Sequence, residues 1–198
     1  GSVFKTVSSI ALLESGKIDP DEPHYCQGYL FDPSRYRCYV YRHYGHGHGD
    51  LTFQDAFAMS CNVYFYNAGR VIGLPHLSGW ADRLGFGRPT GIDLPGEKRG
   101  TLPRPSTTNS QAAQRQSLST ALGLAIGQSR LTATPLQVAR MMAAVGNGGE
   151  LVTPHVVSSF GPMGGEFDFS LRKYPEHAVQ NIAVSSPATW QRVQEALA

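Results

Sequence analysis

Residues 1–16 read GSVFKTVSSIALLESG, and this stretch decides the fold. Its apolar residues recur at the spacing of a helix that is buried along one side, and Gly16 supplies a stop at the C-terminal end. We therefore predict a buried helix over residues 3–15 that begins near Ser2. Ser2 and Lys5 lie three positions apart at its start, which places a hydroxyl and an amine on one face of the helix.

A serine hydroxyl is a poor nucleophile at neutral pH, and a desolvated lysine can accept its proton. Ser2 and Lys5 form an S-x-x-K motif, which occurs by chance in many chains and is weak alone. Ser60-Cys61-Asn62 adds an S-x-N motif, in which a second hydroxyl passes the proton to a leaving group while an amide holds the substrate backbone. Each motif alone is more often an ordinary polar pair on a helix, so serine acyl transfer is here only a hypothesis that needs further matching segments.

Length and composition narrow the class of protein. The 198 residues fit one domain or a large part of one, with 41% hydrophobic and 16% charged residues. A formal charge of +2 without runs of like charge argues against nucleic acid as a partner. The chain contains no apolar run long enough to cross a bilayer and no signal-peptide pattern at its start.

Beyond residue 16 the pattern predicts one long irregular segment and several further helices. Residues 19–50 are rich in Pro, Gly, Tyr, His and Cys, and an irregular segment of this length needs a fastener in a compact domain. The other predicted elements are a helix over 51–72 capped by Thr52 and ended by Gly73, a helix over 76–84, an extended segment over 90–97, a polar irregular segment over 103–116, a helix over 134–145, a strand over 152–159, a turn over 161–165, and a final helix opened by Ser186 and Pro187.

Seven segments of the chain resemble, in the same order, segments of the class B penicillin-binding proteins, and within that class the penicillin-binding protein 2 group of the elongation machinery. They are GSVFK (1–5), GHGDL (47–51), SCNVYFY (60–66), GFG (85–87), TGIDLPGE (90–97), AIGQ (125–128) and LTATPLQ (131–137). The resemblance covers nearly the whole chain. It implies an α+β fold, of which residues 1–198 are a helix-rich portion of a penicillin-binding or serine β-lactamase-like transpeptidase domain, incomplete at both ends.

The resemblance also implies an activity, a peptidoglycan D,D-transpeptidase that cross-links stem peptides. Ser2 would form the acyl-enzyme and would also be acylated by β-lactams, Lys5 would be its general base, and Ser60 with Asn62 would be the second catalytic pair. The implied location is the periplasmic face of the bacterial cytoplasmic membrane, through an anchor outside this chain. The implied partner there is a membrane glycosyltransferase of the elongation complex.

One departure from the family pattern concerns the K-T-G or K-S-G strand, which helps to form the oxyanion side of the site. Residues 1–198 contain neither tripeptide. The segment from Pro187 onward resembles the helix that shortly precedes this strand. Because oxyanion stabilisation is usually a large part of acyl-transfer catalysis, we expect residues 1–198 alone to be inactive.

The three cysteines suggest a metal site. Cys26, Cys38 and Cys61, with His48 or its neighbour His46, would form a Cys3His set of the kind that binds tetrahedral Zn²⁺ in a structural role. Some penicillin-binding protein 2 enzymes hold zinc beside the active site, and in this resemblance His48 is the histidine ligand. The alternative is a Cys26–Cys38 disulfide with Cys61 as a buried thiol.

Two other functions remain open from the sequence. A serine β-lactamase-like hydrolase would use the same nucleophile, although the segments at 90–97 and 131–137 are typical of transpeptidases. A non-catalytic binding or sensor module stapled by metal is the second alternative, in which Gly1-Ser2 is a cloning remnant.

Overall fold

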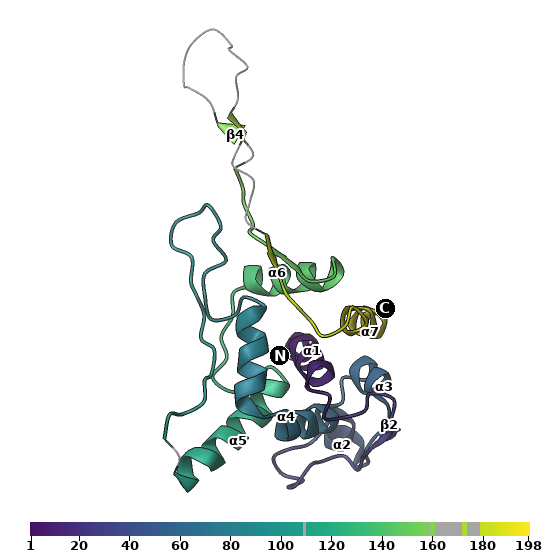
Figure 1. The fold of residues 1–198 in the computed structure, drawn as a ribbon. Coiled ribbons are helices and arrows are strands. Elements are labelled where there is room, and N and C mark those ends of the chain that lie inside the picture. Colours follow the sequence, from purple (N-terminus) through teal and green to yellow (C-terminus); the bar gives the residue numbers. More distant parts are fainter. Residues whose placement is uncertain (109, 158, 161–171, 174–178) are drawn as a thin grey trace.

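The computed structural model describes residues 1–108, 110–157, 159–160, 172–173 and 179–198 (Figure 1). In chain order its elements are η1 (Ser2–Phe4), α1 (Lys5–Ser15), β1 (His24–Cys26), α2 (Tyr39–Tyr44), β2 (Gly49–Leu51), α3 (Phe53–Ala58), α4 (Asn62–Arg83), α5 (Gln111–Ala125), α6 (Pro135–Gly146), β3 (Glu150–Val152), β4 (Ser159–Phe160), β5 (Arg172–Lys173), β6 (Val179–Asn181) and α7 (Ala188–Leu197). The fold is therefore helix-rich α+β, and its described strands form three antiparallel pairs, β1–β2, β3–β6 and β4–β5. No helix among the described residues is both long and apolar enough to cross a membrane.

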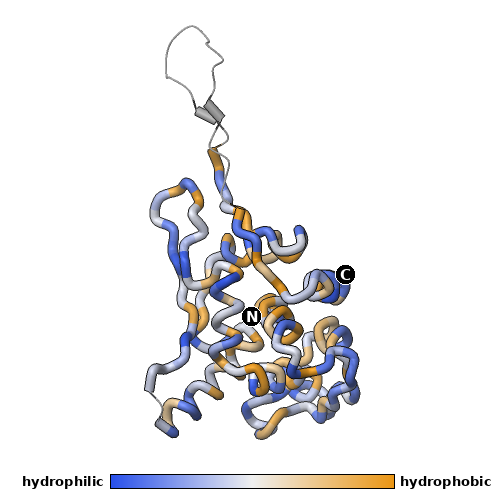
Figure 2. Tube along the Cα trace, viewed as in Figure 1, coloured by the Kyte–Doolittle hydropathy of each residue, from blue (hydrophilic) through white to orange (hydrophobic). Residues whose placement is uncertain are grey.

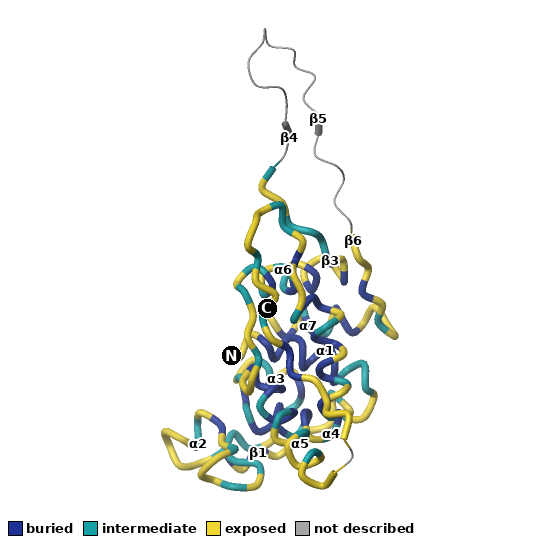
Figure 3. Tube along the Cα trace, turned by 90° about the vertical axis from the view of Figure 1, so that its left-hand side faces the viewer, coloured by how far each residue is buried: buried dark blue, intermediate teal, exposed yellow. Residues whose placement is uncertain are grey.

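Helix α1 is the centre of the core. Its residues from Lys5 to Leu12 are all buried, and it packs against α4 and α7 (Figure 3). Hydropathic colouring places a strongly apolar segment at this position (Figure 2). The helix ends at Gly16, which adopts the left-handed φ of 59°, so the predicted helix and its stop are confirmed.

The predicted single helix over 51–72 is wrong. The chain forms α3, which starts at a capping box between Thr52 and Asp55, and then turns at Ser60 before α4 begins. Ser60 has a φ of 50°, a left-handed conformation that a continuous helix cannot contain. The predicted break at Gly73 is present as a kink inside α4, where Gly73 has a φ of 80°.

Residues 19–50 contain short regular elements, where the sequence indicated an irregular segment. Strand β1 pairs with β2, with Cys26 opposite Gly49 in the register. Between the two strands, the Sγ of Cys38 caps the short helix α2 by accepting from the backbone N–H of Tyr41 at 3.5 Å. The two ends of the segment are therefore fastened to each other by backbone pairing.

The predictions for the second half of the chain have mixed outcomes. The polar segment 103–116 is partly helical, because Ser110 caps α5 and the helix starts at Gln111. The predicted strand 152–159 is broken, since β3 ends at Val152 and the backbone of 153–157 forms no strand, while the predicted turn at 161–165 lies outside the described residues. The final two helices are confirmed as α6 and α7.

Helices α4 and α5 approach each other closely at Gly69. A Cβ at this position would lie 2.8 Å from the Cβ of Ala125 and 2.9 Å from the carbonyl oxygen of Ala121. Gly79, on an exposed side of the same helix, has no atom within 4 Å of the equivalent point. A substitution by alanine at Gly79 therefore changes helix propensity alone, whereas one at Gly69 also changes the packing of α4 against α5.

We predict opposite effects of alanine at these two positions. Gly69→Ala should lower the free energy of unfolding by about 1–3 kcal/mol, because overpacking at the α4–α5 contact exceeds the gain in helix propensity. Gly79→Ala should raise it by up to about 1 kcal/mol. Urea unfolding followed by circular dichroism measures both values, and equal shifts for the two variants would contradict this packing.

Candidate active site

Ser2, Lys5 and Ser60 form one hydrogen-bonded series. Lys5 is the first residue of α1, and its Nζ donates to the Oγ of Ser60 at 2.8 Å and to the carbonyl oxygen of Ser60 at 2.7 Å. The Oγ of Ser60 donates to the Oγ of Ser2 at 3.2 Å. Ser2 and Ser60 are 58 positions apart in sequence, so the fold brings the S-x-x-K and S-x-N motifs together.

Asn62 completes this group. Its Oδ1 accepts from the Nζ of Lys5 at 2.7 Å, and its Nδ2 donates to the carbonyl oxygen of Arg37 at 3.5 Å. Lys5 is 2% exposed, and its three acceptors match the three donors of an ammonium group. All four residues predicted to be catalytic therefore lie in one cluster, with Ser2 exposed at its surface.

The turn between α3 and α4 explains how Ser60 reaches Lys5. Cys61 is fully buried, and its backbone N–H donates to the carbonyl oxygen of Ala56 at 2.8 Å. Ser60 precedes it in the left-handed conformation, which is costly for a residue other than glycine and often occurs at functional sites. Both the hydroxyl and the carbonyl oxygen of Ser60 thus face the amine of Lys5.

Burial changes the acidity of Lys5. Desolvation lowers its pKa from 10.5 to about 8, against an opposing effect of Cys61 and Cys38, which raise it. An amine with this pKa is neutral in about a tenth of the molecules at pH 7 and in half of them at pH 8, and the neutral form can accept a proton. The ring of Phe65 also lies 5.4 Å from the Nζ and limits the access of water to the amine.

The geometry places Ser60 between Ser2, the predicted nucleophile, and Lys5, the predicted base. No hydrogen bond joins Ser2 directly to Lys5 among the described residues. Hydroxyl groups both donate and accept, so the series can reverse its direction when Lys5 is neutral. Ser2 would then donate to Ser60, and Ser60 would donate to Lys5.

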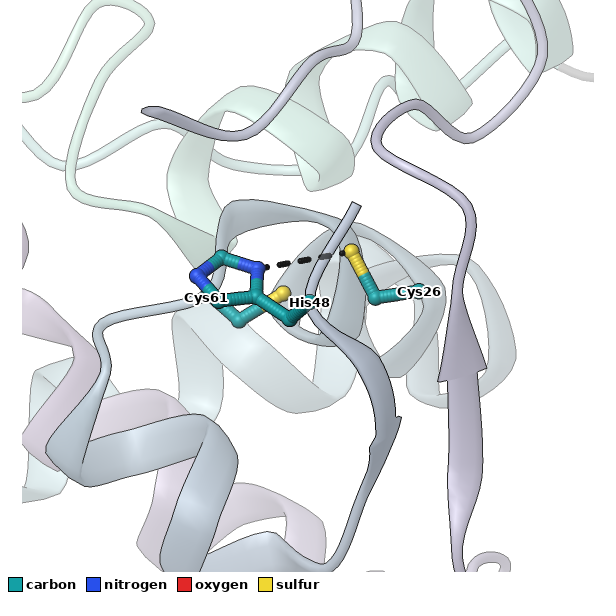
Figure 4. Close-up of side chains that lie close together, drawn as sticks. All are labelled: Cys26, His48 and Cys61. Carbon is teal, nitrogen blue, oxygen red and sulfur yellow. Dashed lines mark hydrogen bonds between the residues drawn. The ribbon is translucent and has the colours of Figure 1, made fainter. Parts of the chain in front are cut away.

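A second cluster adjoins this one at Cys61, the residue between Ser60 and Asn62. The ligand atoms of Cys26, His48 and Cys61 all lie within 4.8 Å of one another, and the Sγ of Cys26 is 3.5 Å from the Nδ1 of His48 (Figure 4). The Sγ of Cys38 lies 3.9 Å from that of Cys26. All three cysteines are buried and free, so the alternative Cys26–Cys38 disulfide is not formed in this structure.

The chemistry of this cluster fits a tetrahedral metal ion. Four ligands at the Zn–S distance of about 2.3 Å are about 3.8 Å from one another, close to the observed separations of Cys26 from Cys38 and His48. Hydrogen bonds from Cys61 and His48 lower the pKa of the Cys26 thiol, and metals bind the thiolate form. His46 is exposed and its Nδ1 lies 2.9 Å from the carbonyl oxygen of Gly47, so His48 is the histidine of the cluster.

The sequence did not predict two contributors to the site. The carbonyl oxygen of Arg37 holds the amide of Asn62, and Phe65 shields Lys5. A backbone carbonyl carries no residue-type signal, and Phe65 looks like any other core residue in an apolar run. The S-x-N motif and the matching segment 60–66 pointed to this part of the chain, but not to these two contacts.

Comparison with known proteins places these clusters in a family. The family model "Penicillin binding protein transpeptidase domain" matches residues 1–198. Peptidoglycan D,D-transpeptidase MrdA of Acinetobacter baumannii is 32% identical over 151 residues, an alignment that covers 76% of this chain and 22% of that protein.

Two solved structures share the fold at similar identity. A crystal structure of Pseudomonas aeruginosa PBP2 in complex with WCK 5153 has a TM-score of 0.80 and 28% identity, covering all of this chain and 43% of the other. A structure on the coordination of polymerization and crosslinking by a peptidoglycan synthase complex has a TM-score of 0.74 and 29% identity, covering all of this chain and 31% of the other. The chain thus spans less than half of each of these relatives, and it belongs to the penicillin-binding protein transpeptidase family.

Proposed function

We propose that this chain carries the nucleophile and the proton-transfer residues of a peptidoglycan D,D-transpeptidase of the penicillin-binding protein 2 type. The observation that carries the proposal is the hydrogen-bonded series from exposed Ser2 through Ser60 to buried Lys5, with Asn62 beside it. An ordinary group of polar surface residues would not include a lysine whose amine is buried. An amine whose pKa is lowered by burial and that is linked to an exposed hydroxyl fits covalent catalysis.

In the proposed reaction, Ser2 attacks the penultimate D-alanine carbonyl of a stem peptide. The proton of Ser2 passes to Ser60, while the proton of Ser60 passes to neutral Lys5. The bond to the terminal D-alanine breaks, and its amine leaves with the proton returned from Lys5. An amine of a neighbouring peptidoglycan strand then attacks the acyl-enzyme. This amine loses its proton to the series of Ser60 and Lys5, and Ser2 is released with its hydroxyl restored.

We predict that Ser2→Ala abolishes covalent labelling by a fluorescent penicillin in the full-length protein. A β-lactam presents a strained acyl group to the same hydroxyl, and alanine offers no nucleophile. Gel fluorescence and the mass of the intact protein measure the label. The matched control is Ser119→Ala, on an exposed side of α5, which should label like the wild type.

Three results of that experiment would reject the proposal. Persistent labelling of Ser2→Ala would place the nucleophile elsewhere. A label that is lost by hydrolysis within seconds would favour the β-lactamase-like alternative, and a wild type without label would favour the non-catalytic module.

We predict a pH dependence set by Lys5. Because its pKa is lowered to about 8, the neutral form that accepts the proton increases as pH rises through this value, and the acylation rate should rise from pH 7 and level off above pH 9. Lys5→Met should slow acylation by about 100-fold or more. Stopped-flow acylation by penicillin measures both, and a flat wild-type profile from pH 7 to 9 would exclude Lys5 as the base.

We also propose that the cysteine cluster binds a structural Zn²⁺. Cys26, His48 and Cys61 supply three ligands, and Cys38 beside Cys26 supplies the fourth after a small movement of its side chain. With all four positions filled by protein, the ion would tie the segment 19–50 to the start of α4. Cys61 lies between Ser60 and Asn62, so the ion would fix both catalytic neighbours.

We predict that His48→Ala lowers zinc affinity by more than about 100-fold, whereas His46→Ala leaves it unchanged. Both variants remove one imidazole from the same loop, but only His48 lies in the cluster. Elemental analysis and competition with a chelator measure the affinity. Wild-type protein with no metal and a single titratable thiol would instead establish the Cys26–Cys38 disulfide.

The wider setting follows from the same relatives and is part of the proposal. The transpeptidase acts on stem peptides at the periplasmic face of the cytoplasmic membrane, held there by an anchor outside residues 1–198. The related structure is of a peptidoglycan synthase complex that coordinates polymerization and crosslinking. Because a glycosyltransferase would carry out the polymerization, this relative supports a membrane glycosyltransferase as the partner.

A further inference from the structure

A segment rich in arginine, histidine and tyrosine lies beside the catalytic cluster. Residues 32–50 contain three arginines, three histidines and four tyrosines, and their acidic residues are Asp32 and Asp50 at the two ends. Tyr36 and Tyr41 pack against the core, and the guanidinium of Arg35 lies over the ring of Tyr36. Neither the proton-transfer series nor the metal cluster uses the remaining arginine and tyrosine side chains, so their chemistry is unassigned.

Several of these side chains form an exposed surface on and next to α2. We call it the basic–aromatic face, and it consists of Arg37, Tyr39, Arg42, His43 and Tyr44. Tyr39 is 63% exposed and Tyr44 is 70% exposed, and the rings of Tyr39 and His43 lie with centroids 4.2 Å apart in a tilted arrangement, with 39° between their planes. Within the described part of the chain, neither Arg37 nor Arg42 forms a salt bridge in direct contact, although the charge of Arg37 contributes to lowering the pKa of Asp32.

This face is fixed to the catalytic cluster. The carbonyl oxygen of Arg37 accepts from the Nδ2 of Asn62, whose Oδ1 accepts from Lys5. The next residue, Cys38, is buried, caps α2 and donates its backbone N–H to the carbonyl oxygen of Gly28 at 2.8 Å. The backbone of Arg37 and the start of α2 are thus held beside Asn62, while the guanidinium of Arg37 extends from this point as an exposed side chain.

We propose that the basic–aromatic face, which adjoins the catalytic cluster at Asn62, binds the free carboxylates of a peptidoglycan stem peptide. Arginine presents a planar fork that matches a carboxylate in a bidentate arrangement, and unpaired exposed guanidinium groups are available for it. Tyrosine and arginine are also the residues enriched at recognition surfaces. The inference rests on the proposed transpeptidase function and adds the part of the substrate that lies outside the reacting bond.

The test measures equilibrium binding of a soluble uncross-linked disaccharide pentapeptide to the full-length protein with Ser2→Ala, which prevents turnover. Arg37→Gln and Arg42→Gln should each weaken binding about two- to fivefold and together about tenfold, with a larger loss for Arg42→Glu. The matched control is Arg115→Gln, an exposed arginine on α5, which should bind like the Ser2→Ala parent. Binding should weaken as salt rises from 50 to 500 mM, because exposed charges are screened.

A second probe separates charge recognition from a general loss of fit. In a pentapeptide whose free carboxylates are amidated, parental affinity should fall and the difference between the arginine variants and their parent should disappear. Arginine variants that bind the charged peptide as tightly as the parent would overturn the inference, as would a difference that survives amidation. The inference would also fall if the variants lost affinity only for phosphatidylglycerol vesicles, since the face would then contact membrane.

Penicillin labelling of the wild-type protein distinguishes the two possible failures. If the wild type forms no acyl-enzyme, the proposed function itself is wrong. If the wild type is labelled while Arg37→Gln/Arg42→Gln binds the charged peptide like its parent, only the role of the basic–aromatic face is wrong.

Discussion

The buried amine of Lys5 is the constraint on which the rest of the structure depends. It lies on the core helix with 2% exposure, and a charged group in that position is costly unless acceptors surround it. All three acceptors come from Ser60 and Asn62, which are 55 and 57 positions away. The turn between α3 and α4 must therefore adopt the one shape that offers them, which accounts for the left-handed backbone of Ser60. The contacts that satisfy Lys5 in the core are therefore the same contacts that assemble the site.

That turn also joins the catalytic cluster to the segment 19–50. Ser60 and Asn62 face Lys5, whereas Cys61 between them is fully buried and its thiol lies near Cys26 and His48. Strand pairing of β1 with β2 brings Cys26 and His48 together, because Cys26 lies opposite Gly49, the neighbour of His48. A displacement of either strand would thus move the cluster of Cys26, His48 and Cys61. Because Cys61 follows Ser60 directly in the chain, the hydroxyl of Ser60 would move with it.

Much of this arrangement could be predicted from the sequence, and the failures have a common cause. The core helix with Ser2 and Lys5 and the helices α6 and α7 carry clear apolar periods and caps, and these predictions are confirmed. The turn at Ser60 was missed because the apolar pattern of α3 continues into α4, and hydrophobic periodicity contains no information about a single left-handed residue. The start of α5 was missed because its first turns are polar and exposed. The bridging position of Ser60 depends on these tertiary contacts, so no spacing rule could give it.

The bridge resolves two conflicting requirements on the site. In the proposed reaction the nucleophile must be exposed to reach its substrate, whereas a lysine acts as a base near neutral pH only if burial lowers its pKa. Ser60 is only partly exposed, and its hydroxyl both donates and accepts hydrogen bonds. It can therefore connect the exposed hydroxyl of Ser2 to the buried amine of Lys5 while both stay in place. A carboxylate in its place would pair with Lys5 and hold the amine in its charged form, which explains why a neutral hydroxyl occupies this position.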